Sequence, residues 1–133
     1  MKSDTAPSNV PKLYRLIDAN INRLREGIRV AEDVVRYIYD NKEIASRLKK
    51  IRHQIRFDDP LLLQYRDIRN DVLKKSTKSE MQRETIEEII KANMKRAQES
   101  ARVLEEALKL IDPNYAELFK TIRYELYDIE KEL

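Results

Sequence analysis

The 133-residue sequence contains no cysteine, one histidine, one glycine and four prolines. The absence of cysteine excludes a disulfide framework, a thiolate nucleophile and a thiolate-bound metal. The single histidine, His53, excludes metal sites built from several imidazoles, and we therefore predict no metal site. So little glycine leaves few positions for tight turns with positive φ, which disfavours multiple hairpins and favours helices.

Charge and hydropathy exclude two further classes of partner. The formal net charge is only +3, and no basic run is interleaved with aromatic residues, so we expect no nucleic-acid partner. No apolar run reaches membrane-spanning length and the N-terminal stretch is polar, so we expect no membrane partner and a cytoplasmic protein. Charged residues make up 38% and carry both signs, which is typical of the solvated faces of one helical domain.

An internal duplication organises the chain. Aligning Ala19–Glu32 with Ala92–Glu105 gives seven identities in fourteen positions, where about one is expected by chance. A weaker similarity follows in each copy, between Leu48–Ile55 and Phe119–Leu126. Each half therefore resembles a long helix followed by a shorter one.

The spacing of apolar residues at three- and four-residue steps predicts amphipathic helices in both halves. Asn41 and Asp112 are predicted N-caps, the latter followed by proline at the first helical position. A capping box beginning at Thr77 or Ser79 is expected to start the second long helix, and a short helix is expected after Pro60. The four main helices are predicted over residues 11–39, 42–57, 81–111 and 113–132.

These elements predict an all-α fold, a pseudo-twofold helical bundle made from a duplicated long-helix/short-helix hairpin with a short connecting helix. Residues 1–10 are expected to form a disordered tail, followed by one helical domain over 11–133. Within that domain we place the first repeat at 11–57, a connector at 58–79 and the second repeat at 80–132.

The duplicated polar residues are the candidates for function. On a helical wheel at about 100° per residue, Asn20 and Asn93 fall within the apolar stripes, so their amides point into the core. Each amide either fixes helix register or binds a ligand. Arg23 and Arg96 flank the same stripes, where a guanidinium needs an acceptor. That acceptor is either a glutamate of a neighbouring helix or an anionic ligand.

Other duplicated residues are better explained by packing. Gly27 and its counterpart Ser100 lie on the buried side, and a glycine inside a helix usually has a packing or functional reason. We therefore expect the long helices to cross there. Arg52 and Arg123 are also duplicated, and we expect them to form ion pairs with glutamates of the long helices.

The two copies of Asn-x-x-Arg-x-x-Glu-x-x-Arg-Val-x-Glu at Asn20–Glu32 and Asn93–Glu105, with Ile51-Arg52-His53 and Ile122-Arg123-Tyr124 after them, resemble a known domain. It is the helical domain found N-terminal to thiamine-phosphate synthase in cyanobacteria and related bacteria. The resemblance implies thiamine biosynthesis, because that domain has been proposed to be an alternative hydroxymethylpyrimidine phosphate kinase. The name thiamine-phosphate pyrophosphorylase would be inherited from the fused synthase, whose (β/α)₈ barrel this chain lacks.

The middle segment departs from the family. There the family pattern resembles Arg-Asp, a short spacer and Asp-Val-Gly-Thr. In this chain Arg66-Asp67 and Asp71-Val72 remain, whereas Leu73-Lys74 replaces Gly-Thr. A loop whose glycine could have approached a phosphate is therefore altered.

The first functional hypothesis is binding or phosphorylation of a phosphorylated pyrimidine. Arginines would bind the phosphate and an asparagine would recognise the pyrimidine edge. If the protein is a phosphotransferase that uses ATP, Mg²⁺ could be held by a carboxylate, that of Glu26, Glu99, Asp67 or Asp71. The absence of a glycine-rich nucleotide loop argues against phosphoryl transfer, and we assign no catalytic residue and no cofactor. The candidate binding residues are Asn20, Arg23, Glu26, Arg66, Asp67, Asn93, Arg96 and Glu99.

Two alternatives remain open at the level of sequence. The chain could be a non-catalytic module that docks to a thiamine-phosphate synthase or forms a homo-oligomer, because the buried amides could serve only to set register. It could also be a small Arg-lined helical enzyme of the chorismate-mutase type. For the outward-facing Glu26 and Glu99, ordinary ion pairing along the helix is the simpler interpretation.

Overall fold

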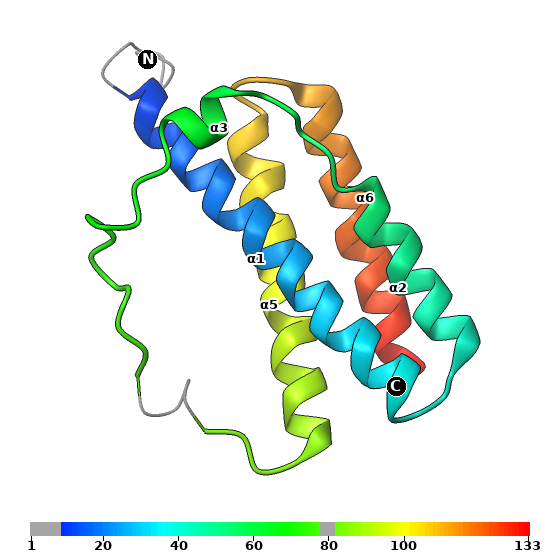
Figure 1. Cartoon of the computed structure of the whole chain (residues 1–133). Coiled ribbons are helices and arrows are strands. Elements are labelled where there is room, and N and C mark those ends of the chain that lie inside the picture. The colour runs from blue at the N-terminus through cyan, green and yellow to red at the C-terminus, as the bar shows by residue number, and fades with distance from the viewer. Residues whose placement is uncertain (1–8, 78–81) are drawn as a thin grey trace.

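The computed structural model describes residues 9–77 and 82–133, so most of the predicted tail lies outside the described residues. These residues form helices only, with no strand among them, which confirms the predicted all-α class. No helix within these ranges is long and apolar enough to cross a membrane. The helices are α1 (Val10–Tyr37), α2 (Lys42–Gln54), α3 (Leu61–Gln64), α5 (Ile86–Leu108) and α6 (Pro113–Lys131) (Figure 1).

The two halves of the duplication form matching helical hairpins. Helix α2 packs on α1 in the first half, and α6 packs on α5 in the second. The halves meet mainly through α1 and α5, the long helices that cross in Figure 1, with a smaller contact between α2 and α6. One core of buried apolar side chains runs through all four of these helices. Each half therefore supplies a large part of the other's buried surface.

Gly27 sets how closely α1 and α5 approach each other. A Cβ atom at this position would lie 2.9 Å from the backbone oxygen of Asn93 and 3.4 Å from the Cβ of Ala97. Only glycine leaves room for a backbone at that distance. Ser100, the counterpart of Gly27 in the second repeat, is also buried. The crossing that the sequence predicts at this small residue is confirmed.

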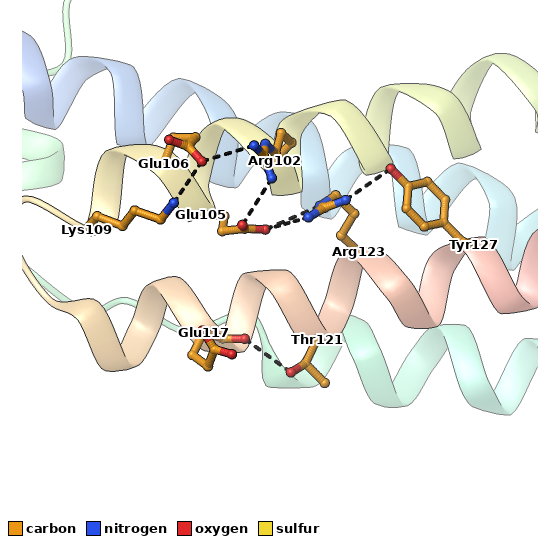
Figure 2. Close-up of polar contacts among 8 residues, drawn as sticks. All are labelled: Arg102, Glu105, Glu106, Lys109, Glu117, Thr121, Arg123 and Tyr127. Atoms are coloured by element: carbon orange, nitrogen blue, oxygen red, sulfur yellow. Dashed lines mark hydrogen bonds and ion pairs between the residues drawn. The ribbon is translucent and has the colours of Figure 1, made fainter.

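In each repeat an equivalent ion pair joins the long helix to its short partner. Arg52 of α2 donates from Nε to Oε1 of Glu32 at 2.7 Å. Arg123 of α6 donates from Nη2 to Oε1 of Glu105 at 2.9 Å (Figure 2). Both glutamates are almost completely buried, with 2% and 5% of their surface exposed. The expected pairing of the duplicated arginines with glutamates of the long helices is confirmed.

Helix α2 ends three residues earlier than predicted. The chain leaves helical geometry at Ile55, whose ψ of 90° is extended. This change of direction buries the Ile55 side chain and places Phe57 edge-to-face against Tyr115, with ring centroids 5.3 Å apart. Tertiary packing therefore overrides the local helical pattern after Gln54.

The predicted start of the second long helix was wrong. Helix α5 begins at Ile86, where Thr85 is the N-cap and its Oγ1 accepts from the backbone N–H of Glu88 at 3.1 Å. Glu88 in turn accepts from the backbone N–H of Glu84 at 2.8 Å. Thr85 and Glu88 have the spacing of a capping box, although Glu88 accepts from the residue before the N-cap. This cap lies eight residues beyond Thr77, whereas Ser79 lies outside the described residues. The predicted caps Asn41 and Asp112 are confirmed by bonds from the N–H groups of the helices they start.

Candidate functional site

The connector after α2 folds back over the N-terminal half of α1. Tyr14 donates its hydroxyl proton to Oδ2 of Asp59 at 2.9 Å, and the other oxygen of that carboxylate accepts from the N–H of Leu61, which starts α3. Burial raises the pKa of the Tyr14 hydroxyl, and the hydrogen bond to Asp59 raises it further by a smaller amount. Further along, Arg15 donates to the backbone oxygen of Asp67 at 3.2 Å. These bonds place α3 and the segment after it against α1.

A bidentate ion pair is the strongest link between this segment and α1. Arg66 donates from Nε and from Nη2 to the two oxygens of Asp18, both at 2.7 Å. The Asp18 carboxylate is buried, and its hydrogen bonds raise the pKa of the Arg66 guanidinium. The next residue, Asp67, accepts from the Asn70 side chain at 2.7 Å and from its backbone at 3.2 Å. Those bonds lower the pKa of Asp67 and fold the segment into a turn.

A cavity of about 930 Å³ lies between α1 and residues 66–72. Its floor is the exposed side of α1, and its outer wall is the segment that Asp18 anchors. Helix α5 contributes only Val103. The polar residues of the lining include three cations in addition to Arg66, two amides of α1 and several carboxylates. The lining consists of Lys12, Arg15, Leu16, Asp18, Ala19, Asn20, Asn22, Arg23, Glu26, Arg66, Asp67, Ile68, Asn70, Asp71, Val72 and Val103.

The structure brings five of the eight candidate residues together at this cavity. These are Asn20, Arg23, Glu26, Arg66 and Asp67. The three candidates from the second repeat, Asn93, Arg96 and Glu99, are not among the residues that line it. The cavity thus combines polar residues of the first copy of the duplicated motif with the connector, and the second copy contributes only the apolar side chain of Val103.

Asn20 and Asn93 make the same bond in the two repeats. Asn20 donates from Nδ2 to the backbone oxygen of Leu16 at 2.9 Å, and Asn93 donates to that of Ile89 at 2.8 Å. Each amide therefore caps a carbonyl of its own helix one turn earlier, which supports the structural interpretation. Asn20 differs because it also lines the cavity, where its carboxamide oxygen can accept a further hydrogen bond.

Arg23 and Arg96 are both exposed, and neither forms an ion pair with any residue of the described ranges. The glutamate acceptor that the sequence allowed is therefore absent within these ranges. The two arginines occupy equivalent positions on equivalent helices, yet only Arg23 lies at the cavity. This difference makes them a matched pair for experiments.

Sequence reasoning missed three charged residues of α1 at the cavity, Lys12, Arg15 and Asp18. Asp18 gave a detectable signal, because it lies at the edge of the apolar stripe beside Ile17 and an acid there needs a partner. Lys12 and Arg15 lie before the duplicated motif, so comparing its two copies gives no signal for them.

The carboxylates at the cavity do not form a metal site by themselves. Among the described residues no three acidic or histidine side chains lie close enough to hold a metal ion. Glu26, Asp67 and Asp71 line the cavity, but the carboxylate of Asp67 is bonded to Asn70. Mg²⁺ commonly binds through one or two carboxylates together with substrate phosphates, so a phosphorylated ligand would have to supply part of its coordination.

Comparison with known proteins identifies the family. The model of the ThiD2 family matches residues 15–132. The chain belongs to the ThiD2 family. Thiamine-phosphate synthases from cyanobacteria are related to this ThiD2 member over most of its length. The protein from Nostoc punctiforme (strain ATCC 29133 / PCC 73102) is 37% identical over 123 residues, and that from Synechococcus sp. (strain CC9605) is 40% identical over 124.

The match covers only part of those relatives. It includes 91% of this chain and 35% of the Nostoc protein, and 90% and 35% for the Synechococcus protein. The same holds for the synthase from Synechocystis sp. (strain ATCC 27184 / PCC 6803 / Kazusa), which is 38% identical over 125 residues and matches over 36% of its length. This ThiD2 chain therefore spans about a third of the curated relatives. No solved structure matches it.

Proposed function

We propose that the cavity on α1 binds a phosphorylated pyrimidine, hydroxymethylpyrimidine phosphate, in thiamine biosynthesis. The observation that carries the proposal is the lining itself. Three cations, Lys12, Arg15 and Arg23, lie along one helix with an amide, Asn20, between them. Cationic side chains of this kind bind phosphate through charge-assisted hydrogen bonds.

The remaining lining suits the aromatic ring of such a ligand. Leu16, Ile68, Val72 and Val103 supply apolar surface on opposite sides of the cavity. A ligand pocket is typically apolar with a few well-placed polar groups that fix orientation. In the proposed complex the carboxamide oxygen of Asn20 would accept a hydrogen bond from an amino group on the ring. In this arrangement Arg66 positions the outer wall, because its bonds go to Asp18.

Calorimetric titration of the whole chain with hydroxymethylpyrimidine phosphate tests the proposal. We expect binding that Arg23→Ala weakens by about tenfold or more, since a hydrogen bond to a charged group contributes about 1.5–3 kcal/mol. Arg96→Ala is the matched control, because it removes the same side chain from the equivalent exposed position outside the cavity. Absence of heat at millimolar ligand, or equal weakening by both variants, would count against the proposal.

Phosphoryl transfer is tested by the same titration repeated with ATP and Mg²⁺. A phosphotransferase would form the diphosphate of the pyrimidine and ADP, which chromatography separates. Arg23→Ala would then lower turnover and Arg96→Ala would not. Binding without product formation would limit the function to ligand binding.

A second candidate function, docking to another protein, is favoured by the outer wall of the cavity. Ile68, Val72 and Leu73 are 72%, 92% and 85% exposed, respectively. Large apolar side chains in one short exposed segment are typical of interaction sites. Sedimentation analysis tests this: self-association would be weakened by Leu73→Ser, and a monomer at high concentration would exclude a homo-oligomer. Co-sedimentation with a thiamine-phosphate synthase would test the other partner.

A further inference from the structure

A second hollow lies between α5 and α6, and it shares no lining residue with the cavity on α1. It has a volume of about 290 Å³. This is near the lower end of the range for ligand pockets, so it suits a small molecule or a single chemical group. Its lining consists of Lys95, Gln98, Glu99, Arg102 and Tyr127.

Gln98 is the unusual member of this lining. Only 2% of its surface is exposed, and its Nε2 has no hydrogen-bond partner. Within residues 9–77 and 82–133 it is the one buried side-chain nitrogen or oxygen in this condition. Buried polar groups are almost always bonded, because an unpaired donor loses its hydration without compensation. An acceptor supplied by a ligand would satisfy it.

Tyr127 offers a second donor. Its hydroxyl oxygen accepts a hydrogen bond from Nη1 of Arg123 at 3.4 Å, as Figure 2 shows. A hydroxyl carries one proton, and the bond from Arg123 leaves that proton available to another acceptor. The guanidinium of Arg123 is itself fixed by the buried Glu105. Its bond to Tyr127 therefore restricts the position of the Tyr127 hydroxyl.

Two cations complete the donor set. Lys95 is exposed on α5 one turn before Glu99. Arg102 is held by Oε2 of Glu105 and by Glu106, each at 3.2 Å (Figure 2). The two glutamates that hold Arg102 also face Arg123 and Lys109, so their charges are shared with other cations.

Glu99 is the opposing charge at this hollow. It is exposed, and the cations Lys95 and Arg102 outnumber it in the lining. The first repeat has no equivalent arrangement, because the counterpart of Gln98 there is the exposed Arg25. The hollow is therefore a feature of the second repeat and not a duplicate of the cavity on α1.

We propose that this hollow binds a small oxyanion, a phosphate or carboxylate group, through hydrogen bonds from Gln98 and Tyr127 and the charges of Lys95 and Arg102. An oxyanion presents several acceptors and a negative charge, which matches a lining of donors and cations. The proposal does not depend on the identity of the ligand at the first cavity.

Nuclear magnetic resonance of the whole ¹⁵N-labelled chain tests this site directly. Inorganic phosphate and acetate are titrated separately at constant ionic strength, and the side-chain amide signals of Gln98 are followed, assigned by their loss in Gln98→Met. We expect a saturable shift with at least one of the two anions. A shift with phosphate alone would assign the site to phosphate groups, and a shift with both would assign it to oxyanions in general.

Variants separate this site from the first cavity. Binding followed on the backbone signals around Tyr127 should weaken about tenfold or more in Gln98→Met, because a hydrogen bond to a charged group is lost. Glu99→Gln should strengthen it by removing the opposing charge. Arg23→Ala should leave the Gln98 shift unchanged, whatever it does to the pyrimidine ligand.

Three outcomes would overturn the proposal. The first is the absence of a saturable Gln98 shift with either anion at tens of millimolar. The second is loss of the shift in Arg23→Ala, which would place the anion at the first cavity. The third is a fall of several degrees in the Tm of Gln98→Met. That fall would show that the amide has a structural partner, because replacing an unpaired donor by an apolar side chain should not destabilise the fold.

Discussion

The contact at Gly27 gives the sharpest test of the fold. In Gly27→Ala the new methyl group would lie 2.9 Å from the backbone oxygen of Asn93. The shortest comfortable approach of a carbon to a carbonyl oxygen is about 3.3 Å, so the helices would have to separate by about 0.4 Å. The oxygen belongs to the backbone of α5 and cannot rotate away. Overpacking of this kind costs about 1–3 kcal/mol.

The helical preference of alanine opposes this cost. Without the contact, Gly27→Ala would stabilise the helix by about 1 kcal/mol. With it, we expect a net loss of about 1 kcal/mol, which corresponds to a fall in Tm of roughly 3–5 °C for a domain of this size. Thermal unfolding followed by circular dichroism measures the change. Ser100→Ala is the control, because the equivalent position in the second repeat already holds a Cβ. A Tm for Gly27→Ala above that of the unmodified protein would refute the reasoning.

Three further outcomes follow from the buried and bridging groups. Glu105→Gln should cost about 2–4 kcal/mol in denaturant unfolding, because it leaves the Arg123 guanidinium of α6, whose side chain is 11% exposed, without its charge partner. The control Glu106→Gln should change the free energy of unfolding much less, because that carboxylate is exposed. Asp18→Asn should release the outer wall of the cavity, giving faster trypsin cleavage within residues 68–77 with little change in Tm; unchanged cleavage would contradict the anchoring role. The raised pKa of Tyr14 means that the unfolded chain loses this proton first, so stability should fall as the pH rises above about 10, and Tyr14→Phe should reduce that alkaline loss; an identical pH profile would exclude Tyr14 as its source.

Most of the fold follows from local patterns. Short stretches of sequence predict the duplication, the four amphipathic helices and the caps at Asn41 and Asp112. All of them appear in the structure. The start of α5 was missed although Thr85 and Glu88 have the spacing of a capping box. Few apolar residues precede Thr85 in the sequence. Thr77 and Ser79 also begin capping-box patterns, however, and these patterns predict an earlier start of the helix.

The spacing of apolar residues does not by itself determine which of them are buried. Leu16 and Ile38 fit the apolar stripe of the first helix, yet 42% and 51% of their surfaces are exposed. Leu16 lies at the cavity, and Ile38 follows the last residue of α1. A helical wheel gives the direction of a side chain, but it does not tell whether another element covers it.

The candidate site was predicted in part because one half of it is local and the other half is not. Asn20, Arg23 and Glu26 share one helix, so their proximity follows from spacing alone. The pairing of Asp18 with Arg66 spans 48 residues and depends on how the connector folds back over α1. The hollow that Gln98 lines likewise depends on contacts between distant residues, because α6 supplies Tyr127 to it. The sequence can indicate that Asp18 needs a partner, but it does not indicate which distant residue supplies it.

The pairing of α1 with α5 has a consequence for the origin of the molecule. The long helix of each hairpin finds its main partner in the other hairpin, so a single ancestral hairpin would have exposed the surface now covered. Such a peptide would have gained stability by associating with an identical copy, and gene fusion would then have joined the two. We expect separately produced fragments covering residues 9–57 and 82–133 to regain helicity on mixing. Fragments that fold fully alone would contradict this origin.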